Sequence, residues 1–302
     1  MSSGQIRYEQ LLADLKAEYR PQREWSEGRG IFLVIGHFLV GVAGGAWVYG
    51  QILSYSPCLV AAVVLGVAGG LAHLVNLGRP ERFWRMMLRV RTSWVARGFW
   101  GLSLFLAGGM LCLPPLLEPA WPWSTGSLLS HAGEALAWVG AVVMIGYMGF
   151  AYMVSKGIPF WNSSLHPILY ITYAARGGAG AVLVLGAFFG PPEDFATGLL
   201  VSWIAITAVV IVLWGVEIVN VLSSGDTAAR WSLHELFRGH LVRYVYGGTL
   251  FIGLVVPAFL MSGMALPRST LTLALVGLSS IIGDLFMKLS SVKAGVHLPI
   301  HP

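Results

Sequence analysis

The sequence predicts an all-α fold, an integral membrane bundle of eight transmembrane helices. Of its 302 residues, 56% are hydrophobic and only 11% are charged, and the mean hydropathy is +0.72. A soluble domain carries roughly 25% charged residues, so water is not the expected solvent for most of this chain. Apolar runs of about 20 residues are long enough to cross a bilayer as helices. The runs here are continuous rather than alternating, which does not fit the strands of a barrel.

Eight such runs follow one another along the chain. They end at turn-forming segments such as YSPC (55–58), LEPAWPW (117–123) and GPPED (190–194), where Pro and Gly interrupt a helix. An N-terminal tail (1–30) and a C-terminal tail (293–302) flank the expected membrane domain (31–292). The expected spans are residues 31–53, 58–77, 98–117, 133–155, 165–189, 197–222, 245–266 and 269–290.

The pentapeptide GVAGG occurs in both of the first two spans, at 41–45 and 66–70. Each copy places two glycines four residues apart on one helix face. Small residues at that spacing allow helix backbones to approach closely in lipid. We therefore expect these glycines to pack the first two helices tightly against each other.

Lys and Arg indicate the orientation of the bundle. Seventeen of the nineteen fall in the tails and in the connectors after spans two, four and six, all on one side of the predicted topology. Only Arg268 falls on the other side, and Arg176 lies within a span. Because cytoplasmic loops carry the excess of Lys and Arg, both termini are expected in the cytoplasm. The alternative is that a bound partner neutralises these charges on the outer face.

The connector after the second span carries six arginines. This segment, residues 78–97, is called the arginine loop below, and it also contains Phe83, Trp84 and Trp94. Arginine pairs well with carboxylates and aromatic residues are enriched at interfaces, so we expect an acidic protein partner to dock here. Binding of anionic lipid is the other use of a basic loop. The expected docking residues are Arg79, Arg85, Arg91, Trp94 and Arg97.

Histidines gather at the same side as the arginine loop. His37 lies about two turns into the first span, and His73 lies about a turn from the end of the second, with Asn76 on the same face. These groups suit a quinone, whose carbonyls need polar partners and whose chemistry needs a proton route. A haem held by His37 and His73 is the competing interpretation, and a purely structural role is a third.

Three charged residues fall inside expected spans, where charge is costly and often functional. Arg176, Glu217 and Asp284 are interpreted as a proton path to the quinone pocket, or alternatively as an internal ion pair that fixes helix positions. They also suggest a secondary transporter, but the half-to-half repeat common in transporters is not evident. The two cysteines, Cys58 and Cys112, are too few to ligate an iron–sulfur cluster, which generally takes four. No metal centre, catalytic residue or nucleic-acid partner is expected in this chain.

Three segments resemble the membrane-anchor family that includes NrfD, DmsC and the polysulfide reductase subunit PsrC. LGRPERFW (77–84) followed by RTSW (91–94) resembles the loop after its second helix, IPFWNSSLHPIL (158–169) its entry into helix five, and FLVGVAGGAW (38–47) its glycine-rich first helix. The resemblance implies a subunit that exchanges electrons with menaquinone or ubiquinone. It implies iron–sulfur clusters and molybdopterin only in the partners, a ferredoxin-like four-cluster subunit and a molybdenum or tungsten bis-pterin catalytic subunit. No haem is expected.

The resemblance also assigns residues by position. Arg82 and Arg89 match basic positions of the family's loop, which lies beside its quinone pocket. Asn76 stands where some members have a histidine that is proposed to touch quinone, and Gly98 stands near a position where some have a glutamate. The expected quinone-binding residues are His37, His73, Asn76, Arg82 and Arg89.

The expected location is a bacterial or archaeal cytoplasmic membrane. Because the positive side and the docking loop coincide, a cytoplasmic catalytic partner is favoured. This points to an oxidation that delivers electrons to quinone, for example by a coenzyme-A thioester dehydrogenase of phenylacetyl-CoA type. The alternative is the anchor of an outward-facing respiratory reductase of the dimethyl sulfoxide or polysulfide type, which oxidises quinol.

Overall fold

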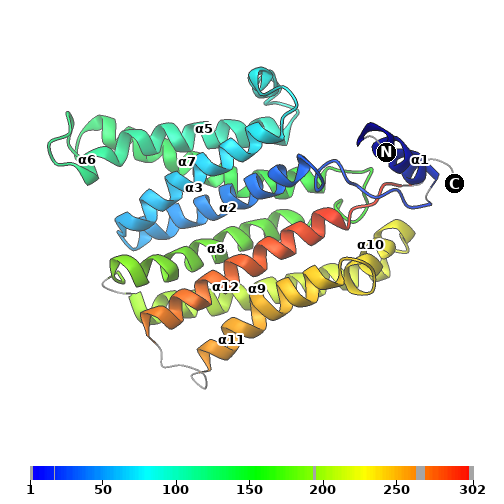
Figure 1. Ribbon diagram of the computed structural model, residues 1–302. Coiled ribbons are helices and arrows are strands. Elements are labelled where there is room, and N and C mark those ends of the chain that lie inside the picture. Colours follow the sequence, from blue (N-terminus) through cyan, green and yellow to red (C-terminus); the bar gives the residue numbers. More distant parts are fainter. Residues whose placement is uncertain (1–2, 17, 193–194, 263–268, 299–302) are drawn as a thin grey trace.

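The protein is a bundle of long helices (Figure 1). The computed structural model describes residues 3–16, 18–192, 195–262 and 269–298. Within these residues there are eight helices long and apolar enough to cross a membrane, and there is no strand apart from an isolated bridge between Pro21 and Val296. The predicted all-α membrane fold is confirmed. Arg268 and the end of the expected seventh span lie outside the described residues.

Each predicted span corresponds to a helix, or to two helices in direct succession. The spans are α2 (Gly30–Ile52), α3 (Ser56–Asn76), α5 (Trp94–Cys112) with α6 (Pro114–Leu117), α7 (Leu128–Met153), α8 (His166–Phe189), α9 (Phe195–Ser223), η2 (Arg243–Val255) with α11 (Val256–Met261), and α12 (Thr270–Lys293). The connecting segments contain α1 (Ser3–Lys16), η1 (Pro80–Arg82), α4 (Trp84–Met87) and α10 (Thr227–Phe237).

The third and fourth spans begin four or five residues earlier than the hydropathy predicts. Ser93 caps α5 by accepting a hydrogen bond from the Ala96 amide at 3.2 Å, and Ser127 caps α7 by accepting one from the Ser130 amide at 3.2 Å. A serine at this position satisfies an amide that would otherwise have no partner in the first turn. The capped turns extend both helices beyond their apolar stretches.

Two groups of four spanning helices meet along α2, α7 and α8. Helices α2, α3, α5 and α7 form one group, and α8, α9, η2–α11 and α12 form the other (Figure 1). Gly45 of α2 lies against the backbone of Ala174 and Gly178 of α8, so the two groups touch at backbone distance. A side chain at Gly45 would collide with α8.

The expected tight packing of the first two helices is found, but the GVAGG glycines account for it only in part. The close contact of α2 and α3 is made by Gly69 of the second copy and by Gly36, which lies outside the motif. Gly45 faces α8, and Gly66 faces Phe105 of α5 instead. Each helix therefore uses different glycines for different neighbours, which one repeated motif does not reveal.

The segment Arg243–Val255 is wound as a π-helix rather than the expected α-helix. Its wider turns leave the Gly253 carbonyl available, and this oxygen accepts a hydrogen bond from Arg176 Nη2 at 2.6 Å. Gly253 also lies against Gly283 of α12. Because π-helical turns are often found at functional sites, the polar groups beside η2 are considered further below.

The charged connectors gather at one end of the bundle. The described ends of the chain, α4 of the arginine loop and α10 lie at this end, whereas α6 and α11 lie at the opposite end (Figure 1). Cys58 and Cys112 are both free thiols. The arrangement agrees with the predicted grouping of basic segments on one face of the membrane.

Candidate functional site

His37 and His73 lie against each other in the first group of helices. Their ring centroids are 4.7 Å apart, and both side chains are buried, at 3% and 5% exposure. His37 is seven residues after the start of α2, about 10 Å along the helix. Packing of α2 against α3 thus brings these two predicted residues to one place.

Tyr147 of α7 completes this polar cluster and was not identified from the sequence. Its hydroxyl lies 3.4 Å from His73 Nε2, and its ring centroid is 5.8 Å from that of His37. The ring packs directly on Gly98 of α5, where any side chain would collide with it. Gly98 therefore makes room for a tyrosine from another helix.

A cavity of about 190 Å³ lies beside these three residues, and it is called the histidine cavity below. Asn76 and Leu77 from the end of α3 and Met86 of α4 form part of its wall, so the arginine loop itself contributes to the cavity. A cavity of about 150 Å³ accommodates benzene. The histidine cavity therefore has room for a substituted ring, with imidazole, amide and phenol groups as hydrogen-bonding partners. The remaining wall is apolar or aromatic, namely Trp25, Leu33, Val95, Phe99, Met148 and Ala151.

The structure does not bring Arg82 and Arg89 into the cavity wall. Both side chains are exposed on the arginine loop, and Arg82 lies 3.9 Å from its neighbour Glu81. Within the described residues, the arginine loop contributes Met86 and Val95 to the wall. Arg82 and Arg89 are therefore available to a partner rather than directed at a ring in the cavity.

The expected docking residues divide into two kinds. Arg79, Arg85 and Arg91 are exposed. Arg97 lies over the Trp94 ring at 4.1 Å and donates to the carbonyls of Val90 and Arg91 at 3.0 and 2.9 Å. Trp94 in turn stacks on Phe150 of α7, with ring centroids 4.3 Å apart. Arg97 and Trp94 thus hold the loop in shape, and the other three present charge on its surface.

Arg176 and Asp284 form an ion pair inside the second group of helices. Both are buried, at 2% and 4% exposure. Arg176 also donates from Nε to Thr207 Oγ1 at 3.0 Å and from Nη2 to the Gly253 carbonyl, so it links four helices. The internal pair was one of the two interpretations of the charged residues. Burying such a pair is favourable only when its remaining donors find partners, as those of Arg176 do.

Glu217 lies apart from that pair. It is buried at 2% exposure, and one carboxylate oxygen accepts a hydrogen bond from Ser163 at 2.8 Å. Within the described residues, no contact joins it to Arg176 or Asp284. The structure thus brings two of the three predicted proton-path residues together.

A smaller polar cavity of about 30 Å³ separates His37 from Asp284. His166, Tyr170 and Lys288 also line it, and Lys288 lies 4.6 Å from the Tyr170 ring. This volume is enough for about one water molecule. Lys288 was not identified from the sequence, because it stands at the polar end of an expected span, where lysine is common.

The N-terminal tail is folded against the end of the bundle rather than extended into solvent. The Gln22 amide donates to the Gly295 carbonyl at 2.8 Å, and the His297 amide to the Arg20 carbonyl at 2.8 Å. We call residues 20–27 and 293–297 the terminal clasp. Partial burial and the nearby charge of Arg20 lower the pKa of His297, so the clasp favours a neutral imidazole.

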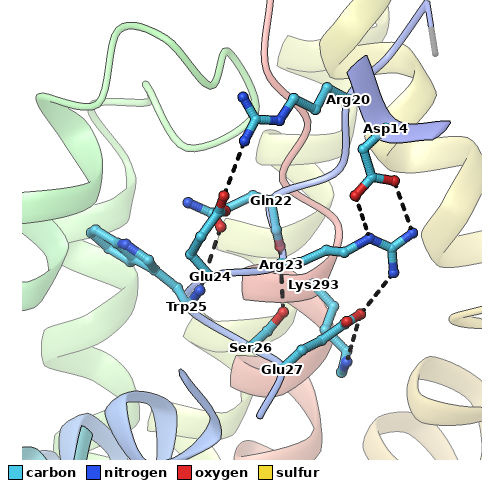
Figure 2. A network of polar contacts seen from close by, with 9 residues as sticks. All are labelled: Asp14, Arg20, Gln22, Arg23, Glu24, Trp25, Ser26, Glu27 and Lys293. Carbon is cyan, nitrogen blue, oxygen red and sulfur yellow. Dashed lines mark hydrogen bonds and ion pairs between the residues drawn. The ribbon is translucent and has the colours of Figure 1, made fainter. Parts of the chain in front are cut away.

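Ion pairs brace the first segment of this clasp, and one of them, between Lys293 and Glu27, joins its two segments (Figure 2). Arg23 contacts both carboxylate oxygens of Asp14, at 2.9 and 3.3 Å, and Glu27 at 3.0 Å, while Lys293 lies 4.0 Å from Glu27. Trp25 follows directly and packs on Trp161, with ring centroids 5.2 Å apart. Because Trp25 also lines the histidine cavity, the clasp forms one wall of that cavity.

The fold and its internal cavity define a multi-pass membrane protein with a polar, ring-sized site between helices. The chain belongs to the polysulphide reductase NrfD family, whose model matches residues 30–296. The resemblance stated from the sequence is confirmed. Members of this family are quinone-interacting membrane subunits, and they typically pair with catalytic and iron–sulfur subunits of reductases.

One curated relative is Protein NrfD of Escherichia coli (strain K12). It is 30% identical over 140 residues, which is 41% of this chain and 43% of the relative. The match thus spans less than half the length of that protein.

Proposed function

We propose that this chain carries electrons between an iron–sulfur partner subunit, docked on the arginine loop, and a quinone bound in the histidine cavity. The observation that carries the proposal is the wall shared by the loop and the cavity: Met86 lies between Arg82 and Arg89 in sequence and lines the cavity that His37 and His73 also line. A redox centre resting on the loop would therefore be close to a ring in the cavity.

The residues of the cavity suit the two-electron, two-proton chemistry that a quinone supplies when bound. An imidazole can donate a hydrogen bond to a carbonyl oxygen and can also hold a proton. His73 is oriented by the Tyr147 hydroxyl, and Asn76 offers both donor and acceptor groups. Trp25 and Phe99 provide flat apolar surfaces, and water is excluded by their packing.

The partners are proposed to be a ferredoxin-like four-cluster iron–sulfur subunit and a molybdenum or tungsten bis-pterin catalytic subunit, on the cytoplasmic side. An oxidation that feeds electrons into menaquinone or ubiquinone, of the coenzyme-A thioester type, agrees with that placement. The exposed charges of Arg79, Arg85 and Arg91 support docking of an acidic surface. A proton path through Arg176, Glu217 and Asp284 remains a prediction.

His37→Ala and His73→Ala test the proposal in the complex purified through this chain. We expect quinone-linked turnover to fall about 100-fold, the lower range of what a positioned acid–base group contributes, while turnover with a soluble dye acceptor is unchanged. His131→Ala is the matched control, because that histidine is exposed in the first turn of α7 at the opposite end of the bundle.

Wild-type quinone turnover in both cavity variants would contradict the quinone site. A purified complex without iron would contradict the partner assignment. A haem spectrum from the isolated chain would indicate that His37 and His73 hold a haem, and it would contradict the quinone site.

A further inference from the structure

A second cavity lies in the other group of helices, on the far side of the Arg176–Asp284 ion pair. It has a volume of about 230 Å³ and is bounded by α8, α9, η2 and α12; we call it the distal cavity. It shares no lining residue with the histidine cavity. The small cavity lies between the two, since it shares His37 and Met148 with one and Tyr173 and Asp284 with the other.

The distal cavity has an apolar wall with a few polar groups at one place. Asp284 Oδ1 is paired with Arg176, but Oδ2 is buried without a hydrogen-bond partner in the described residues. The Tyr173 hydroxyl accepts a hydrogen bond from Trp214 Nε1 at 2.5 Å, which leaves its own hydrogen available. A buried acceptor without a partner is energetically unfavourable, so a ligand that donates to Asp284 Oδ2 would recover this loss.

The rim of the distal cavity reaches the lipid-facing surface of the bundle. Ile211 of α9 is 51% exposed and Gly215, one turn further on, is also exposed, and both line the cavity. A Cβ atom at Gly215 would meet no other atom within 4 Å. A lipid-soluble molecule could therefore enter between α9 and η2 without passing through water.

These features select the chemistry of the ligand. The volume exceeds the roughly 150 Å³ that holds benzene, and Trp214 and Phe237 provide aromatic walls. An ionised carboxylate accepts hydrogen bonds and donates none, so the ligand must carry a donor on an apolar ring. We propose that the distal cavity is a second site, which binds the hydroxylated, reduced form of a lipid-soluble quinone in preference to the oxidised form. Only the identity of the ligand rests on the proposed function.

The number of quinol molecules bound per chain tests this inference. The complex is placed in lipid nanodiscs freed of endogenous quinone and titrated anaerobically with decylubiquinol and, separately, with decylubiquinone. We expect two molecules of decylubiquinol per chain and one of decylubiquinone. Gly215→Leu, which obstructs the rim, should reduce the decylubiquinol count to one. Gly247→Leu is the matched control, since that glycine is also exposed and unobstructed but lines neither cavity, and it should retain two.

The outcomes separate this inference from the proposed function. If the wild-type complex binds one decylubiquinol, or Gly215→Leu still binds two, the distal site is overturned. One decylubiquinol molecule is expected to remain bound in Gly215→Leu. If adding His73→Ala abolishes the binding of this molecule, ligand binding in the histidine cavity is supported, whatever the result at the distal cavity. If His73→Ala changes no binding while Gly215→Leu removes one molecule, the distal site stands and the proposed quinone site fails. A phospholipid that occupies the cavity and is not displaced by decylubiquinol overturns the inference. An unchanged melting temperature of the complex in nanodiscs shows that each variant is folded.

Discussion

Gly98 and Tyr147 occupy one position in space from two helices. The ring of Tyr147 lies where a side chain on Gly98 would be, and this contact directs its hydroxyl to within 3.4 Å of His73 Nε2. The orientation of one candidate ligand group thus depends on the absence of a side chain on another helix. This dependence is a packing effect, so the same residue types at other depths would not reproduce it.

Tyr147→Phe should raise the quinone KM about 3- to 10-fold, the equivalent of one lost hydrogen bond of about 0.5–1.5 kcal/mol. The apolar volume is retained, so dye-linked turnover and thermal stability should hardly change. The steady-state kinetics of the purified complex measure both.

Gly98→Ala gives an independent check on that contact. The added methyl group meets the Tyr147 ring, which must move away from His73. The variant should therefore match or exceed the Tyr147→Phe defect, and combining the two substitutions should add little. A fully additive double variant would show that the Tyr147 hydroxyl acts elsewhere.

At the scale of elements, the two tails form one structural unit. The terminal clasp joins the segment before α2 to the segment after α12, and α1 is attached to it through Asp14 and Arg23. Hydropathy describes these tails only as polar. Their ordered arrangement comes from backbone hydrogen bonds and ion pairs between residues more than 250 positions apart, which a local pattern does not encode.

Arg23→Gln should loosen the first segment of the clasp, which Arg23 braces through Asp14 and Glu27, and so release the Trp25 wall of the histidine cavity. We expect the quinone KM to rise about threefold with little change in dye-linked turnover, because the electron route from the loop is intact. Arg20→Gln is the control, since its pair with Glu24 is an exposed contact of the kind that contributes about 0–1 kcal/mol.

High salt provides the second measurement for the same effect. Screening of partly exposed ion pairs should move the wild-type KM toward that of Arg23→Gln, and the variant itself should respond less. An equal response of both proteins to salt would mean that Arg23 does not hold the clasp.

The existence of every span could be predicted, because about 20 apolar residues in a row leave few alternatives. Helix ends were harder to predict where a capping serine extended a helix into polar sequence, as at Ser93 and Ser127. The π-helical winding of η2 was not predicted, and neither were the contacts of Gly253 with Arg176 and Gly283 from two other helices.

The candidate site, like the fold, could be predicted from the sequence only in part. His37 and His73 could be placed together from their depth in antiparallel neighbours. Tyr147 and Trp25 were missed, because a tyrosine or tryptophan near a helix end is usually explained by the interface of the membrane. Lys288 was missed because lysine is common at the polar end of a span. The sequence does not say which helices are neighbours, and it is the packing of the helices that places these three residues in the walls of the two cavities.

At the scale of the whole molecule, the orientation in the membrane is open to direct measurement. Single cysteines introduced at Arg91 and, as the control at the opposite end, at Trp121, both exposed positions, should be labelled by a membrane-impermeant maleimide from opposite sides. We expect Arg91→Cys to react in inverted vesicles, whose cytoplasmic face is turned outward, and not in intact cells. The two native cysteines are first replaced by serine. Labelling of Arg91→Cys from outside would assign the arginine loop to an outward-facing reductase.

The contact of residues 20–22 with residues 295–297 has a consequence for biogenesis. Translation proceeds from the N-terminus and early segments fold first, yet the segment that carries Trp25 acquires its final contacts only when residues 295–297 have emerged from the ribosome and returned to it. The membrane helices can insert one after another, but the pocket beside the histidines is finished last. If the proposed quinone site is correct, we expect a nascent chain to bind its ligand only after residues 295–297 have been made.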